Sequence, residues 1–175
     1  MTATSSSRTG YRVHSCTCLP AQFFVEGFAG VDAAGAMASS PGSPFSMAPV
    51  IPTGLANASA AIASPRGLVA CAWTQNVSSA ASMLPLTLSA AVPPGASAAI
   101  DLPFPRLSLN PDRSFPTNVE LTEGGVAVWR GGAFVPGVAG VESIELVPPS
   151  WPLEWYSLRA TVLAGQYDFE AAIAS

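Results

Sequence analysis

Short segments in which apolar and polar residues alternate fill the chain from Leu55 onward. A period of two places every second side chain on one face of a β-strand. Gly and Pro turn signals separate the segments, and short strands separated in this way are typical of an antiparallel β-sandwich. The pattern predicts strands over residues 56–63, 67–75, 84–92, 97–102, 118–121, 125–130, 141–147, 158–162 and 165–172.

Alanine-rich segments leave a helical alternative open for residues 56–63 and 89–99, because alanine has the highest helix propensity. Pro65, Pro93 and Pro94 interrupt or border these segments and favour strands. We therefore predict a mostly-β chain built as an antiparallel β-sandwich.

Two alternating runs flank a Pro-Pro-Gly turn between Leu86 and Pro103. The prolines fix φ and lack a donor, and Gly95 permits a positive φ. This arrangement predicts a β-hairpin. The pairs Gly124-Gly125 and Gly131-Gly132 likewise predict tight hairpin turns.

The N-terminal third has a different pattern of residues from the rest of the chain and predicts a helix and a linker instead of strands. Residues 20–31 begin with a proline, place Phe23, Phe24 and Phe28 in one apolar arc and reach Gly30, which predicts a helix of about three turns. Residues 33–54 are rich in Pro, Gly, Ser and Ala, which predicts a linker without helix, although residues 47–52 can serve as an edge strand.

These patterns predict a boundary near residue 54. Residues 1–54 would hold an irregular start, the helix and the linker, and residues 55–175 would form the sandwich. The apolar arc of the helix would have little to pack against, so we expect self-association through Phe23, Phe24 and Phe28.

Composition restricts the partners. Hydrophobic residues make up 49% of the chain and charged residues 10%, with seven arginines, no lysine and a net charge of −4. Nucleic acids and anionic membrane surfaces both require concentrated Lys and Arg, so we expect neither as a partner. We also expect no transmembrane helix, because no strongly apolar run is long enough.

The three cysteines predict no chemistry. Cys16 and Cys18 are too close in sequence to form an unstrained disulfide, and with Cys71 they lack a suitably spaced histidine for zinc. We expect free thiols, no metal site and no cofactor.

The order of several short motifs carries a resemblance to a known family. His14 and Pro20 are followed by FFVEGFAGV, APVIPTGL, SPRGLVACAW, the run at 86–103, VELTEGGVAVW and AGQYDF. This order resembles the C-terminal end of the bacterial-type α-L-rhamnosidases, glycoside hydrolases in which a small β-sandwich follows a catalytic (α/α)₆ barrel. The resemblance implies that the helix at residues 20–31 is the remnant of the last barrel helix.

The same resemblance implies a non-catalytic role. In the family the general acid and base come from barrel segments upstream of the histidine motif, and these would precede Met1. We therefore expect no catalytic pair among the eleven acidic residues. The chain would support the barrel of an α-L-rhamnosidase-like enzyme that releases terminal rhamnose from glycosides.

Four residues are candidates for sugar binding. His14 matches a family His-Gly-Trp motif, although Ser15 and Cys16 stand where Gly and Trp are expected, and it could simply be solvated. The three others lie in the proline-rich PPSWPLEWYS segment and could stack on sugars or cover one end of the sandwich: Trp151, Trp155 and Tyr156. A free-standing carbohydrate-binding sandwich or a purely structural one is the alternative function.

Two other tryptophans have a structural interpretation. Trp73 and Trp129 end alternating apolar runs, which favours a place in the core.

Overall fold

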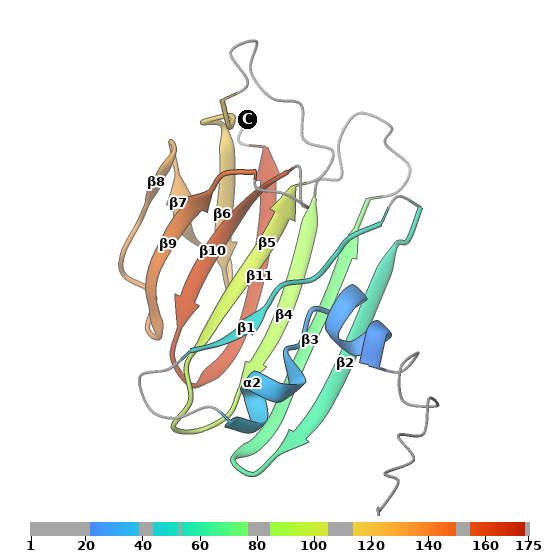
Figure 1. Cartoon of the computed structure of the whole chain (residues 1–175). Coiled ribbons are helices and arrows are strands. Elements are labelled where there is room, and N and C mark those ends of the chain that lie inside the picture. The colour runs from blue at the N-terminus through green and yellow to red at the C-terminus, as the bar shows by residue number, and fades with distance from the viewer. Residues whose placement is uncertain are drawn as a thin grey trace, which may run out of the picture.

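Two β-sheets packed face to face form the molecule (Figure 1). The computed structural model describes residues 22–38, 44–52, 54–76, 85–104, 114–149 and 155–173. All strand pairings within these residues are antiparallel except the one between β1 and β5. The predicted mostly-β sandwich is confirmed.

The strands divide unequally between the sheets. In spatial order the smaller sheet contains β1 (Phe45–Met47), β5 (Ala98–Phe104), β10 (Tyr156–Val162) and β9 (Val141–Val147). The larger sheet contains β2 (Asn57–Ser64), β3 (Gly67–Gln75), β4 (Leu86–Val92), β11 (Gly165–Ile173), β6 (Val119–Glu123), β7 (Val126–Arg130) and β8 (Ala133–Phe134). Strand β11, the last in the sequence, lies between β4 and β6.

All nine predicted strands form, with ends that differ by at most two residues. The pattern missed the two-residue strand β8, and it placed the N-terminal edge strand slightly too late in the chain. The turn at Gly124-Gly125 joins β6 to β7 as predicted, with φ of 54° and 82°. Glycine suits both positions because a side chain disfavours such angles.

The predicted hairpin between Leu86 and Pro103 is wrong. Strand β4 pairs with β3 and β11 in the larger sheet, whereas β5 pairs with β1 and β10 in the smaller one. The Pro-Pro-Gly turn therefore carries the chain across the sandwich. Alternation gives the face of each strand but does not say whether two apolar faces lie side by side in one sheet or opposite each other across a core.

The predicted three-turn helix at residues 20–31 is also wrong in its extent. A single π-helical segment, η1 (Phe23–Phe28), ends where the amide of Ala29 donates to the Phe24 carbonyl at 3.1 Å. The segment predicted to lack helix contains α2 (Ala33–Ala38). Its prolines begin only after this helix ends, and the Asp32 carboxylate accepts a hydrogen bond from the Gly35 amide at 2.8 Å, as an N-cap does.

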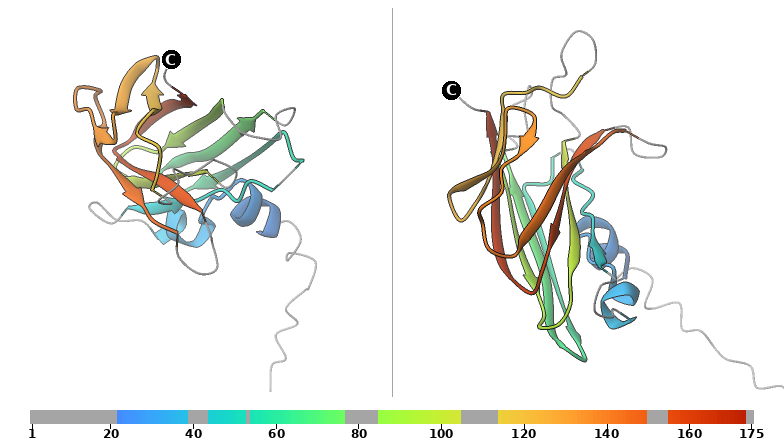
Figure 2. Two further views of the ribbon diagram at one scale, coloured as in Figure 1. Left: turned by 90° about the horizontal axis from the view of Figure 1, so that it is seen from above. Right: turned by 90° about the vertical axis from the view of Figure 1, so that its left-hand side faces the viewer.

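Residues of this N-terminal segment enter the sandwich core. Val31, Met47 and Ile51 are at most 3% exposed and belong to the same buried cluster as the strands. The two helices lie in the layer of the smaller sheet, beside β1 and against β2 (Figure 2). The Trp73 indole N–H on β3 donates to the Phe28 carbonyl at 2.7 Å and fixes η1 there.

A tight backbone crossing also holds the segment. A Cβ added to Gly30 would lie 2.1 Å from the backbone nitrogen of Pro49, so only glycine fits at this point. The Ala48 amide donates to the Gly30 carbonyl at 2.8 Å. The predicted boundary requires that residues 55–175 fold without residues 1–54. Their independent folding stays a prediction.

Candidate functional site

The predicted sugar-binding residues are only partly placed. His14 and Trp151 lie outside the described residues. Trp155 and Tyr156 are neighbours at the start of β10, and both are half-buried. Their role in substrate binding stays a prediction.

Tyr156 belongs to a row of aromatic rings at one end of the sandwich. Its ring centroid lies 5.6 Å from that of Phe115, which in turn lies 5.3 Å from that of Phe104. Phe104 and Phe115 are buried, and Tyr156 packs against the core from its edge. At least part of the Tyr156 ring is therefore used in packing.

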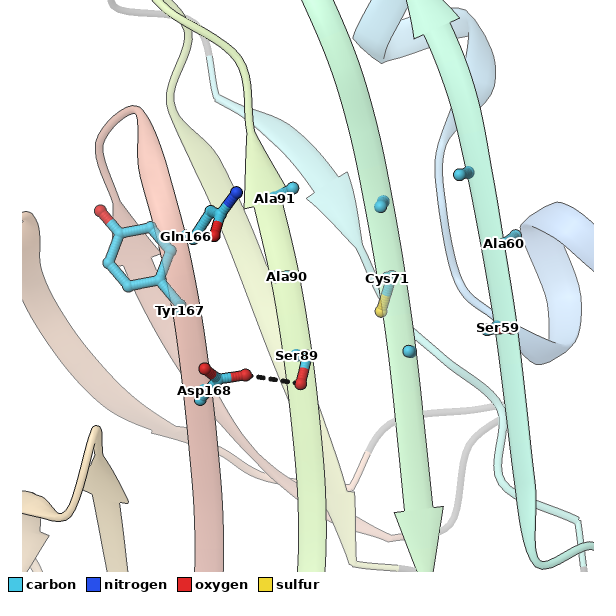
Figure 3. Close-up of a pocket in the computed structure, with 12 residues that line it drawn as sticks. Ser59, Ala60, Cys71, Ser89, Ala90, Ala91, Gln166, Tyr167 and Asp168 are labelled. Carbon is cyan, nitrogen blue, oxygen red and sulfur yellow. Dashed lines mark hydrogen bonds between the residues drawn. The ribbon is translucent and has the colours of Figure 1, made fainter.

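The outer face of the larger sheet holds a shallow depression with a volume of about 420 Å³ (Figure 3). Strands β2, β3, β4 and β11 line it, and half of the lining residues are alanines. Polar groups stand along β4 and β11, where the Ser89 hydroxyl donates to the Asp168 carboxylate at 2.6 Å. Sequence reasoning missed this surface, although small residues at the outward positions of neighbouring strands are its visible signal.

Three charged side chains form a row across the outer face of the smaller sheet. Arg159 on β10 donates to both carboxylate oxygens of Asp101 on β5, at 2.7 and 2.9 Å. Glu145 on β9 lies 3.8 Å from the same guanidinium. The hydrogen bond to Asp101 raises the pKa of Arg159. The row is an ion-pair ladder across three strands.

Other carboxylates are engaged in local contacts. Glu120 pairs with Arg130 across two neighbouring strands. Glu123 accepts a hydrogen bond from the Asp168 amide at 3.4 Å. Glu120 therefore faces a cation and Glu123 a backbone amide.

An aromatic cluster on η1, called here the phenylalanine cluster, consists of the exposed Phe23 and Phe24 and the half-buried Phe28. The ring centroids lie 5.2 Å apart for Phe23 and Phe28 and 5.5 Å apart for Phe24 and Phe28. Phe23 is 60% exposed and Phe24 58%. Exposed apolar groups gathered in this way are common at interaction surfaces. Self-association through the cluster stays a prediction.

Cys71 is a free thiol inside the sandwich, on β3. Burial raises its pKa from 9.0 to about 12, so it is protonated at neutral pH. Cys16 and Cys18 lie outside the described residues.

Within the part of the chain that the structure describes, no group of three or more His, Cys, Asp and Glu side chains could hold a metal ion. Neither of the two described helices is long and apolar enough to cross a membrane.

A family model and a solved structure that are similar to this chain both come from α-L-rhamnosidases. The family model described as bacterial alpha-L-rhamnosidase C-terminal domain matches residues 39–113. The solved structure of alpha-L-rhamnosidase from Dictyoglumus thermophilum superposes with a TM-score of 0.51 at 14% identity. That match covers 85% of this chain but only 13% of the rhamnosidase chain. A comparison with curated proteins gave no match.

Proposed function

We propose that this chain, which carries a C-terminal α-L-rhamnosidase-like region, acts as the non-catalytic β-sandwich of an α-L-rhamnosidase-like glycoside hydrolase and supports its catalytic barrel. The observation that carries the proposal is the phenylalanine cluster, which is exposed on a helix whose backbone is fixed to the sandwich core. A surface of this kind suits rigid attachment to a neighbouring protein domain.

The physical reason is the burial of aromatic surface. Full burial of a Phe side chain contributes about 1.5–3 kcal/mol relative to exposure. Phe23 and Phe24 retain more than half of their surface for a partner. Since η1 is held by the Trp73 indole, docking on the cluster needs no rearrangement of the sandwich. Without a barrel, the same cluster favours self-association of the chain.

The contacts of the carboxylates support a non-catalytic role. Glycoside hydrolysis needs one protonated and one ionised carboxyl group on either side of a sugar. Asp101 and Glu145, the acids of the ladder, both face Arg159. A guanidinium between two carboxylates occupies the space that a sugar would need.

Hydrolysis of an aryl α-L-rhamnoside tests the proposal. We expect no turnover by the purified chain above the uncatalysed rate, with an intact α-L-rhamnosidase as the positive control. Turnover that is lost on replacing one acidic residue, for example Asp101→Asn, would contradict the non-catalytic role.

Carbohydrate binding is the second candidate function, and the half-buried pair Trp155 and Tyr156 at the end of the sandwich favours it. Titration with rhamnose or a rhamnoside, followed by tryptophan fluorescence, distinguishes the two. The supporting role predicts no change or only millimolar binding. Micromolar binding that Trp151→Ala or Trp155→Ala abolishes would establish the binding module instead.

A further inference from the structure

Strand β2 forms an unprotected edge of the larger sheet. It runs for eight residues, Asn57–Ser64, with no charged residue, no proline and no register shift. Among the described residues it pairs only with β3. One row of its backbone N–H and C=O groups therefore faces away from the sheet, and such a row is a template for another strand.

The other edges are protected in recognised ways. Strand β8 has only two residues and β1 only three. Strand β9 carries Glu142 and Glu145, and its pairing with β10 shifts register between Thr161 and Val162. Short strands, charges and irregular pairing all discourage strand addition, so β2 is the edge left open to it.

The inward face of β2 is also incompletely covered. Ala58 and Ile62 point toward the interior but stay half-buried, whereas Val69 and Cys71 on the adjacent β3 are at most 1% exposed. Helix η1 packs against β2 on this side (Figure 1). A strand added beyond β2 would extend the sheet and cover more of this apolar face.

We propose that β2 pairs in antiparallel fashion with β2 of a second copy of this chain, which joins the two larger sheets into one. A twofold axis at Ala60 places Ser59 opposite Ala61 on the outer face and Ala58 opposite Ile62 on the inner face. Apart from the pair of Asn57 and Ala63, each directly opposed pair within β2 then consists of small or apolar residues, which fit closely across two strands.

Charge explains why a second copy suits this edge. The chain carries a net charge of −4, which opposes close approach of two copies over most of the surface. The acids of the strands lie on β5, β6, β9 and β11, whereas β2 has none. The uncharged edge is therefore where two acidic copies can approach. The twofold axis also keeps both η1 helices on the same side of the joined sheet.

Two lysines on the outward face of β2 test the proposal. In the Ser59→Lys/Ala61→Lys variant each new lysine faces a lysine of the other copy, which opposes pairing, while both side chains are exposed in one copy. The matched control is Gln166→Lys/Glu170→Gln on the central strand β11, which adds one positive charge and removes one negative charge at exposed positions, so the net charge changes by the same two units. Both variants lower the net negative charge, so a general charge effect would favour association in each.

Sedimentation equilibrium and amide hydrogen exchange give the outcome. We expect the unmodified chain and the β11 control to reach about twice 17.8 kDa at high concentration, with β2 amides that become protected as the concentration rises. The β2 variant should lack that protection at every concentration. With Phe23→Ser/Phe24→Ser added, which removes self-association through the phenylalanine cluster, it should stay at 17.8 kDa. A monomeric unmodified chain would overturn the proposal. So would protection of the β2 amides that survives the β2 lysines, or that is lost in Phe23→Ser/Phe24→Ser alone, because β2 pairing would then not be the contact.

Discussion

The substitution Met47→Ala tests whether the N-terminal segment belongs to the same folding unit as the sandwich. This residue ends the edge strand β1, pairs with Ile100 on β5 and forms a bridge with Val31. Its side chain is 0% exposed. We therefore expect Met47→Ala to destabilise the whole sandwich, even though the sequence pattern places Met47 in a linker, at the start of a possible edge strand.

The size of the effect follows from burial. Replacing a fully buried Met by Ala removes apolar atoms and leaves a cavity, which together cost about 2–5 kcal/mol. For a chain of this length 1 kcal/mol corresponds to a shift in Tm of roughly 2–4 °C. Met47→Ala should therefore lower Tm by roughly 4–20 °C.

Met37→Ala is the matched control. Met37 lies on α2 in the same predicted linker, but it is 56% exposed, so its replacement should change the stability by less than about 0.5 kcal/mol. Urea unfolding followed by tryptophan fluorescence measures both variants, with an unchanged m-value as evidence of comparable unfolding. Equal, small effects of the two substitutions would refute the reasoning and would favour a sandwich that folds without residues 1–54.

Two further predictions concern buried polar groups. Trp73→Phe should cost about 0.5–1.5 kcal/mol beyond the change in ring size, because the hydrogen bond to the Phe28 carbonyl is lost. Trp129→Phe should lower the free energy of unfolding by less, because the Trp129 indole N–H is buried without a hydrogen-bond partner in the described structure. Equal losses of unfolding free energy in urea would contradict this prediction. The folded-state pKa of Cys71 lies above its ordinary value, so the stability that its thiol form provides should fall as pH rises from 9.0 toward about 12, and Cys71→Ala should remove that dependence. A thiol reagent at pH 8 should modify Cys71 only on unfolding. Rapid modification of Cys71 itself in the folded chain, located by peptide mass spectrometry to separate it from Cys16 and Cys18, would disprove its burial.

Local patterns predicted the strands better than the connections between them. The period of two reproduced strands such as β3 and β9 without error at either end, because alternation reports directly on which face of a strand is buried. The same alternation predicted a hairpin where β4 and β5 lie in opposite sheets. The assignment of strands to sheets depends on contacts between residues far apart in sequence, which one chain's pattern does not contain.

The N-terminal segment shows a second limit. Helix α2 had a visible signal, since Asp32 is an N-cap residue directly before a run of alanines and glycine, but the nearby prolines outweighed it. The burial of Val31 and Met47 had no comparable signal, because it arises from a backbone crossing at Gly30 and Pro49. Tertiary packing decided the place of this segment.

The sequence predicted the candidate site less well than it predicted the fold. The aromatic segment near Trp155 was a reasonable prediction, but its neighbour Tyr156 packs on Phe115, which is distant in sequence. The depression beside Asp168 combines residues from four strands and has no motif. The unprotected edge of β2, in contrast, can be seen in its uncharged sequence once the order of the strands is known.

The central place of β11 determines how the chain can fold during its synthesis. Strands β2, β3 and β4 form one half of the larger sheet and β6, β7 and β8 the other, and β11 joins the two halves. Among the described strands β11 is the last that the ribosome makes, so each half of the larger sheet keeps an open edge until β11 emerges. Until then the nascent chain exposes two strand edges at which another chain can pair.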